Sequence, residues 1–186
     1  MKKIVSDITQ FQYFYPYTVA VVGARKGEEL NYMSCAWHTA LSFHPPLFGV
    51  LVAKKRRTHG FISQAREFTV NFLGRDDILL SARMGRISGY EQDKIKTFKV
   101  ELEPAHSINT PVLASAYAAF ECRLQDVRTY GDHDLFVGEV QTVQVNAQSF
   151  DAEGVLDTRQ VKPLLYMGCD LYLTVDPETL EHKLPD

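Results

Sequence analysis

The stretch ASAYAAFECRLQDV, residues 114–127, decides the fold class of this chain. Small and apolar residues recur at every second position, which is the period of a β-strand with one buried face. Such alternation is typical of antiparallel sheets, in which one face packs on the core and the other meets water. We therefore expect a half-buried antiparallel strand. The residues on its core face are Ala116, Ala118, Phe120, Cys122 and Leu124.

Other short apolar runs extend this pattern along the chain. A turn-like segment, TYGDH, leads from the strand expected at 114–127 into another strand candidate, DLFVGEVQTVQV at 134–145. Helical signals are fewer: one short segment follows Thr58, a candidate N-cap, and another, DDILLSARMG, ends at Gly85. Six or more strands with hairpin-like spacing predict a closed or nearly closed antiparallel barrel and not a βαβ fold. The remaining strand candidates are TVAVVGA at 18–24, LFGVLVA at 47–53, FTVNFL at 68–73, LLYMG at 164–168 and LYLTV at 171–175.

Size and composition fit one domain that spans residues 1–186. The chain is 45% hydrophobic with a formal net charge of −3, which gives no reason to expect nucleic acid as a main partner. Its three cysteines are widely spaced and form no CxxC pattern, so neither a disulfide framework nor a zinc site is indicated. No stretch is long and apolar enough for a membrane span, and the start lacks the apolar region of a signal peptide. We expect a cytoplasmic protein.

Standard catalytic motifs are absent, but one stretch combines cations with a hydroxyl group. The chain contains neither of the glycine-rich phosphate-binding motifs, G-x-G-x-x-G after a strand and G-x-x-x-x-G-K-[ST]. It also lacks the hydrolase motif G-x-S-x-G and the metal-binding motif H-E-x-x-H. In KKRRT, residues 54–58, four cations precede the expected start of a helix, where free backbone N–H groups and the helix dipole favour an anion. A solvated strand end is the alternative interpretation. His38 and His44 have no third ligand at suitable spacing, so we expect no metal site.

The stretch NYMSCAW, residues 31–37, raises a similar question. It is either a core strand that contains polar residues or an edge that faces a ligand. A flat, phosphorylated cofactor needs polar groups around its ring and an aromatic wall, and Asn31, Ser34 and Trp37 offer both. Together with the cationic run at 54–58, these residues favour the interpretation that the stretch faces a ligand.

Seven pieces of the sequence resemble the flavin reductase-like family, in this order from residue 15 to residue 172: NYMSCAWHTALSFHPP, RRTHGFI, FTVN, SGYEQDK, AFECRL, GDHDLFVGEV and KPLLY. The nearest resemblance is to flavoredoxin-type members. It implies a mainly β fold, the FMN-binding split β-barrel, which is antiparallel and Greek-key with a few short peripheral helices. FMN is the implied cofactor.

The resemblance also implies roles for individual residues. Asn31 and Trp37 match positions that contact the isoalloxazine and ribityl parts, and Thr58 matches a phosphate-binding hydroxyl. Lys94 and His133 match the catalytic positions, with Lys94 reaching the flavin and His133 at the flavin and nicotinamide pocket. The full implied FMN-binding set is Asn31, Met33, Ser34, Cys35, Ala36, Trp37, Ala53, Lys54, Arg57, Thr58, Lys94, His133 and Tyr166. Cys35 within the loop and the pair Phe43 and His44 before the prolines depart from the family pattern.

The implied activity is hydride or electron transfer through bound FMN, as in an NAD(P)H:flavin reductase or a flavoredoxin-like carrier. The electron donor is NADH, NADPH or a redox partner protein. Without a dinucleotide motif, a nicotinamide has to stack directly on the flavin, and we expect Lys94 and His133 near the pyrimidine edge, where they stabilise the reduced form. The aromatic run FQYFYPY, residues 11–17, suits either a homodimer contact or core burial. A non-catalytic FMN store or sensor, and a metal-dependent or nucleic-acid-binding barrel, are the alternatives.

Overall fold

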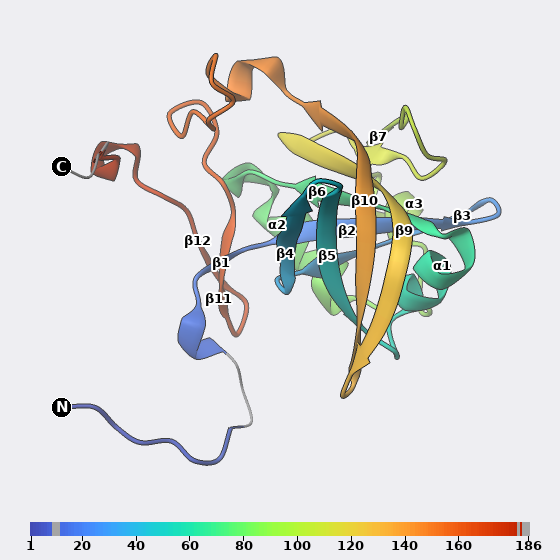
Figure 1. Ribbon diagram of the computed structural model, residues 1–186, viewed down its shortest axis with the longest axis horizontal. Coiled ribbons are helices and arrows are strands. Elements are labelled where there is room, and N and C mark those ends of the chain that lie inside the picture. Colours follow the sequence, from blue (N-terminus) through green and yellow to red (C-terminus); the bar gives the residue numbers. More distant parts are fainter. Residues whose placement is uncertain (9–11, 182, 184–186) are drawn as a thin grey trace.

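The largest element of the computed structural model is a curled sheet of seven antiparallel strands in the order β3-β2-β6-β9-β10-β5-β4 (Figure 1). The structure describes residues 1–8, 12–181 and 183. β9 and β10 form a long hairpin at the centre of the sheet. The strands are β2 (Ala20–Lys26), β3 (Glu29–Cys35), β4 (His38–Phe43), β5 (Pro46–Ala53), β6 (Glu67–Phe72), β9 (Ala118–Tyr130) and β10 (His133–Val145).

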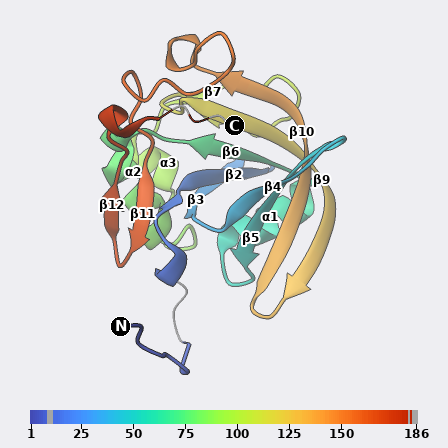
Figure 2. The same ribbon diagram turned by 60° about the vertical axis from the view of Figure 1, so that its left-hand side comes forward.

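The sheet curls because its two edge strands are consecutive in the chain. β3 and β4 lie at opposite ends of the strand order, yet only Ala36 and Trp37 separate them. The two ends of the sheet must therefore lie close together, and they do: the thiol of Cys35, the last residue of β3, donates to the carbonyl of Leu51 in β5, the neighbour of β4, over 3.6 Å. The result is a barrel that is split where the chain passes from β3 to β4, at residues 36 and 37; Figure 2 shows the two strands.

Short helices and two small sheets surround the barrel. The helix α1 (Arg57–Ala65) joins β5 to β6, while α2 (Ile78–Arg86) and α3 (Lys94–Phe98) lie between β6 and β9. The small sheets are β1 (Tyr17–Thr18) with β11 (Leu165–Gly168) and β12 (Leu171–Leu173), and β7 (Leu102–Glu103) with β8 (Val112–Leu113). Single 3-10 turns occupy η1 (Gln12–Phe14), η2 (Arg75–Asp77), η3 (Ala147–Ser149) and η4 (Pro177–Thr179).

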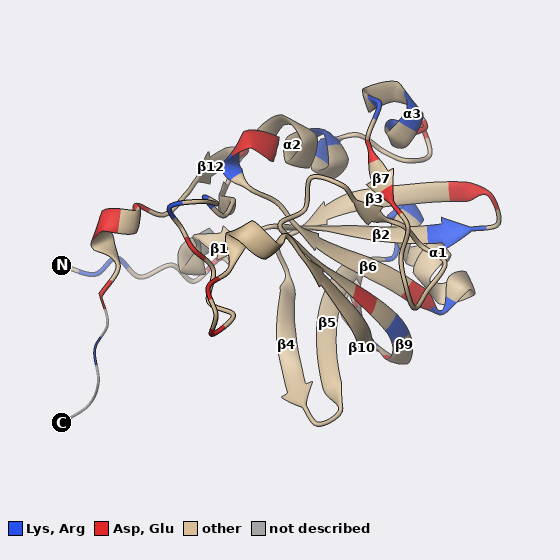
Figure 3. Cartoon of the chain, turned by 90° about the horizontal axis from the view of Figure 1, so that it is seen from above, with Lys and Arg blue, Asp and Glu red and all other residues tan. Residues whose placement is uncertain are grey.

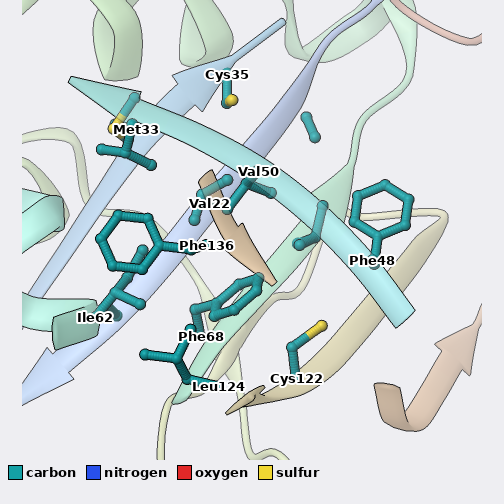
Figure 4. Packing of buried hydrophobic residues seen from close by; sticks show 14 of the residues in the cluster. Val22, Met33, Cys35, Phe48, Val50, Ile62, Phe68, Cys122, Leu124 and Phe136 are labelled. Carbon is teal, nitrogen blue, oxygen red and sulfur yellow. The ribbon is translucent and has the colours of Figure 1, made fainter. Parts of the chain in front are cut away.

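The core has two parts that share β2 and β3. Inside the barrel, Val22, Phe68 and Phe136 are fully buried, and Ile62 from α1 packs among them (Figure 4). On the outer face of the same strands, a second cluster packs Tyr32 against residues that include Met84 of α2. Both faces of β2 are thus covered, which explains why its sequence is an unbroken apolar run and does not alternate.

The mainly β, antiparallel split-barrel fold with few short helices is confirmed. The strand expected at 114–127 corresponds to β9, which begins later, at Ala118, and so leaves Ala116 outside the strand; within β9, Cys122 and Leu124 are buried while Arg123 and Gln125 are exposed. Glu121 breaks the alternation: it is fully buried, and its carboxylate accepts the amides of residues 106 and 107. The stretch NYMSCAWHTALSFHPP, residues 31–46, forms most of β3, all of β4 and the start of β5.

Both helix ends differ from the expectation. Thr58 does not cap α1: Arg56 is the N-cap residue, and Thr58 lies within the first turn with a fully buried side chain. Gly85 does not end α2, which continues through Arg86. Among the described residues, no helix is both long and apolar enough to cross a membrane.

Candidate flavin site

Three hollows lie in a row along the split side of the barrel. The first has a volume of about 180 Å³, the second about 240 Å³ and the third about 490 Å³. Arg56 lines both the first and the second, and Ala36 lines both the second and the third. The three hollows therefore form one continuous surface.

The first hollow is cationic. It lies between β3, the start of α1, residues 87–89 and α3. No acidic residue lies in the first turn of α1, and no side chain caps its N-terminus. The helix dipole therefore adds to the charge of the side chains, and an anion is the ligand that this end of the barrel favours. The cations that line it are Lys55, Arg56, Arg57 and Lys94.

A buried polar pair forms the floor of this hollow. The side-chain amide of Asn31, in β3, donates to the hydroxyl oxygen of Thr58, in α1, over 2.6 Å. Asn31 is 4% exposed and Thr58 is fully buried. Because the hydroxyl oxygen accepts this bond, its own hydrogen is the group that can be donated to a ligand.

The segment at 87–89 lies directly against this pair. A Cβ atom at Gly89 would come within 1.9 Å of Oδ1 of Asn31, so only glycine fits there without displacing the amide. The carbonyl of Gly89 accepts a hydrogen bond from Arg57, which also forms an ion pair with Glu29. Arg57 is thus held at the rim by two partners.

Lys94 is a buried cation in the same hollow. It is 4% exposed, and its Nζ donates to the carbonyl of Met84 over 3.0 Å. It begins α3, where the carboxylate of Asp93 caps the helix by accepting two backbone amides. Burial, together with the nearby charge of Arg56, lowers the pKa of Lys94 to about 8. A bound anion would favour its charged form.

The second hollow lies between α2 and the hairpin β11–β12. Nε of Arg86 lies 2.6 Å from Oδ1 of Asp170, which joins the helix to the hairpin, and Figure 2 shows the two side by side. Tyr166 and Tyr172 line the hollow, with ring centroids 5.2 Å apart. Ser34 lines it too, and its hydroxyl donates to the carbonyl of Ser81.

The third hollow is mainly aromatic, and Asp132 is the one acidic residue among the described residues that line it. The rings of Trp37 and His133 lie 4.9 Å apart, centroid to centroid, and tilted by 44°. Nε1 of Trp37 donates to the hydroxyl of Tyr15 over 3.0 Å, and Nδ1 of His133 lies 2.7 Å from the carboxylate of Asp132. The described residues that line this hollow include no lysine or arginine. The strands β4 and β5 beside it carry no Lys, Arg, Asp or Glu (Figure 3).

A cationic hollow, a partly aromatic hollow and a mainly aromatic hollow, side by side in this order, match the parts of a phosphorylated ring cofactor and a second ring. Residues 12–171 match the family model described as the flavin reductase like domain. The chain belongs to the flavin reductase-like family. The resemblance seen in the seven sequence pieces is therefore confirmed.

Proteins similar to this flavin reductase-like protein are found among solved structures and among protein sequences. The crystal structure of an FMN-binding protein from Thermus thermophilus with bound 1-cyclohex-2-enone is 37% identical, with a TM-score of 0.87, and the match covers 98% of this chain and 99% of that one. Flavoredoxin from Methanosarcina acetivorans is 26% identical with a TM-score of 0.84, over 95% and 92% of the two chains. The reductase component of a FADH(2)-dependent resorcinol hydroxylase from Rhizobium sp. is 30% identical over 89% of this chain and 84% of its own.

Most of the residues expected at the flavin line these hollows. The first hollow contains Asn31, Met33, Arg57, Thr58 and Lys94; the second contains Ser34, Ala36 and Tyr166; the third contains Ala36, Trp37 and His133. Lys94 and His133, which we expected at one edge of the ring, line different hollows. The structure therefore separates the two residues expected to act together.

Three expected residues do not line any of the three hollows. Cys35 is buried in the barrel, where its thiol donates to the carbonyl of Trp37, and burial raises the pKa of that thiol to about 11. Ala53 is 7% exposed and pairs with His133 in the sheet. Lys54 turns away from the first hollow, and its Nζ lies 3.7 Å from Oδ1 of Asp134.

Sequence reasoning missed several residues of the site. Lys55 and Arg56 line the first hollow in place of Lys54. The start of the helix decides which of four consecutive cations face a ligand. The sequence pattern does not indicate that Arg56 is the N-cap residue. Gly89 lies within the quoted piece SGYEQDK, but nothing local indicates that it touches Asn31.

Proposed function

We propose that this flavin reductase-like protein binds FMN across the first and second hollows and acts as an oxidoreductase that passes hydride or electrons through it. The observation that carries the proposal is the first hollow, where the buried pair of Asn31 and Thr58 lies among three cations at the start of α1 and a fourth, Lys94, at the start of α3. A phosphate monoester is the anion that such a site suits, since it carries up to two negative charges and three acceptor oxygens.

In this arrangement the phosphate occupies the first hollow and the ring system extends past Arg56 into the second. Thr58 donates its hydroxyl hydrogen to a phosphate oxygen, and Arg57 and Lys94 supply charge. Lys94 thus acts on the phosphate and not at the pyrimidine edge. Tyr166, Ser34 and the backbone of residues 33–36 border the ring. When bound, FMN supplies the two-electron and one-electron chemistry of its ring, which the side chains around it orient and tune.

The third hollow receives the second reactant. We propose that the nicotinamide ring of NADH or NADPH, or the ring of an electron acceptor, packs there against Trp37 with His133 as its polar partner. The Thermus thermophilus protein was solved with 1-cyclohex-2-enone and also with p-hydroxybenzaldehyde, which shows that a 37% identical relative binds small cyclic carbonyl compounds. An FMN reductase (NADH) from Agrobacterium fabrum, 33% identical over 66% of each chain, supports a nicotinamide donor.

We further propose a homodimer. Tyr13 and Phe14, from the aromatic run at 11–17, are 74% and 54% exposed, which argues against core burial for these two. Leu41 and Phe43 on the edge strand β4 are 44% and 87% exposed. An apolar edge of this kind is a contact surface in many oligomers. Phe11, the first residue of the run, lies outside the described residues.

The test is reconstitution followed by anaerobic reduction. Purified protein is saturated with FMN, unbound flavin is removed, and bleaching of the flavin absorption is followed with NADH and with NADPH. The proposal predicts retained FMN and bleaching by at least one donor. Retained FMN without bleaching by either donor would support a carrier that takes electrons from a partner protein, or a store or sensor. Failure to retain FMN would contradict the proposal.

A further inference from the structure

The carboxylate of Asp134, near the start of β10, lies on the far side of the cationic segment, residues 54–58, from the first hollow. Asp134 is 6% exposed and lines none of the three hollows. Its Oδ2 lies 2.7 Å from Nε2 of His59, and its Oδ1 accepts the hydroxyl of Thr129 over 2.7 Å and lies 3.7 Å from Nζ of Lys54. Both carboxylate oxygens therefore have partners.

Two of these partners lie at the two ends of the cationic segment. Lys54 is its first residue, and His59 follows its last. The edge of the His59 ring packs on Phe136 in the barrel, with centroids 5.0 Å apart. One carboxylate on the rigid hairpin β9–β10 thus contacts the segment before and after the residues that face the hollow.

On the hollow side, the segment is held at Thr58 by the buried hydrogen bond from Asn31, and at its two arginines by contacts nearer the surface. Arg56 is exposed and donates to the carbonyl of Gly85 over 3.4 Å, and Arg57 pairs with the exposed Glu29 at the rim. The contacts of Asp134 with His59 and Thr129 hold the opposite side of the segment, and the low exposure of the carboxylate shields them from water better than surface ion pairs are shielded.

We propose that Asp134 is a positioning residue that fixes the cationic segment, and so sets the affinity for the phosphate of FMN without touching it. This inference rests on the proposed function. His59 and Thr129 hold the pKa of Asp134 below its ordinary value through their hydrogen bonds, against the opposing effect of burial, so the carboxylate is ionised. Successive side chains of a strand point to opposite sides, which places His133 in the third hollow while its neighbour Asp134 faces α1.

If Asp134 acted only through its charge, replacing it would change FMN affinity in the opposite direction. A negative charge beside an anion site weakens anion binding, so removing it would tighten binding. A positioning role predicts weaker binding when the hydrogen bonds are lost. The two roles can therefore be separated by variants that remove the charge with or without the hydrogen bonds.

The experiment compares the dissociation constants of FMN and riboflavin for the full chain and its variants. Asp134→Ala removes both charge and hydrogen bonds, while Asp134→Asn keeps an oxygen that accepts from Thr129 and an amide that faces His59. Asp126→Asn is the matched control, because Asp126 lies on the same hairpin, exposed and paired with Arg128. Riboflavin lacks the phosphate, so it reports any general loosening of the barrel.

For Asp134→Ala we expect FMN to bind about tenfold more weakly, the loss of roughly one charge-assisted hydrogen bond, with riboflavin binding unchanged. Asp134→Asn should restore most of the affinity, and Asp126→Asn should match the unchanged protein. Tighter FMN binding by both Asp134 variants, equal weakening of both flavins, or no change in either would overturn the inference. If the unchanged protein bound FMN no better than riboflavin, the proposed phosphate site itself would fail, and this inference with it.

Discussion

The side-chain nitrogen of Asn31 lies 2.6 Å from the hydroxyl oxygen of Thr58, and this bond joins β3 to the first turn of α1. The two residues are 27 positions apart in the chain. Because both are buried, neither polar group can exchange its partner for bulk water. The bond fixes the direction in which Thr58 can donate, which is what a preorganised phosphate site requires.

Thr58→Val should weaken FMN binding by about tenfold or more, since it removes a hydrogen bond to a charged group worth roughly 1.5–3 kcal/mol. It also leaves the buried amide of Asn31 without its acceptor, at a cost of about 1–3 kcal/mol in the free energy of unfolding. Titration calorimetry and thermal unfolding measure the two effects. Thr97→Val, at an exposed position in α3, is the control. Unchanged FMN affinity in Thr58→Val would show that this hydroxyl does not contact the phosphate.

Affinity for FMN should fall as the pH rises through about 8. The pKa of Lys94 is lowered to about 8 by burial and by Arg56, so the side chain is charged below that pH and neutral above it. FMN phosphate favours the charged form, and the phosphate itself is already mostly a dianion above about pH 6. Binding therefore takes up a proton near pH 8, and the ratio of FMN to riboflavin affinity decreases above it.

Lys94→Met should bind FMN weakly with a flat pH profile over the same range, measured as dissociation constants from about pH 7 to about pH 10. Lys96→Met, at an exposed position on the same helix, should keep the profile of the unchanged protein. An unchanged profile in Lys94→Met would assign the titration to another group. The same pKa predicts that flavin-free protein becomes more stable between about pH 8 and about pH 10.4, because unfolding then requires Lys94 to take up a proton.

Gly89→Ala should weaken FMN binding without contact between the new methyl group and the ligand. The added Cβ would lie 1.9 Å from Oδ1 of Asn31, so the amide has to shift and its bond to Thr58 with it. We expect a loss of about tenfold in FMN affinity. Gly60→Ala in α1, where no atom lies within 4 Å of the new Cβ, is the control and should be neutral or stabilising by up to about 1 kcal/mol. Equal affinities of the two variants would argue against a role for residues 87–89 in shaping the hollow.

His133→Ala should slow the reduction of bound flavin and leave the affinity for FMN nearly unchanged. His133 lines the third hollow against Trp37 and does not line the first, so the FMN dissociation constant should stay within about twofold of the original value. The rate of flavin reduction by NADH or NADPH should fall, up to about a hundredfold if the nicotinamide is misplaced. Stopped-flow bleaching of the bound flavin measures this rate. His44→Ala, exposed at the turn between β4 and β5, should reduce at the original rate. Loss of FMN binding in His133→Ala would place the histidine at the flavin itself.

The fold was more predictable than the site, for physical reasons visible in single residues. The period of two at residues 116–124 follows directly from strand geometry, so β9 and the antiparallel barrel could be inferred from local pattern. The barrel closes beside Ala36 and Trp37, where the thiol of Cys35 in β3 donates to the carbonyl of Leu51 in β5. That closure depends on strand order, which no local pattern encodes.

The direction of side chains was the less predictable part of the site. The run KKRR marks an anion site, but a helix that starts at Arg57 turns Lys54 toward Asp134 and leaves Lys55 and Arg56 at the hollow. The position of Lys94 likewise depends on a helix start, because α3 places it beside Met84 in the first hollow and not beside His133. Contacts between distant segments, such as Gly89 with Asn31, appear only once the chain is folded.

The most direct test of the central claim is the ratio of the dissociation constants for FMN and riboflavin, measured by titration calorimetry on the unchanged, flavin-free protein near pH 7. A cationic first hollow with two or more charge-assisted hydrogen bonds predicts FMN binding at least about a hundredfold tighter than riboflavin. Equal affinities for the two flavins, or no binding of either, would contradict the claim.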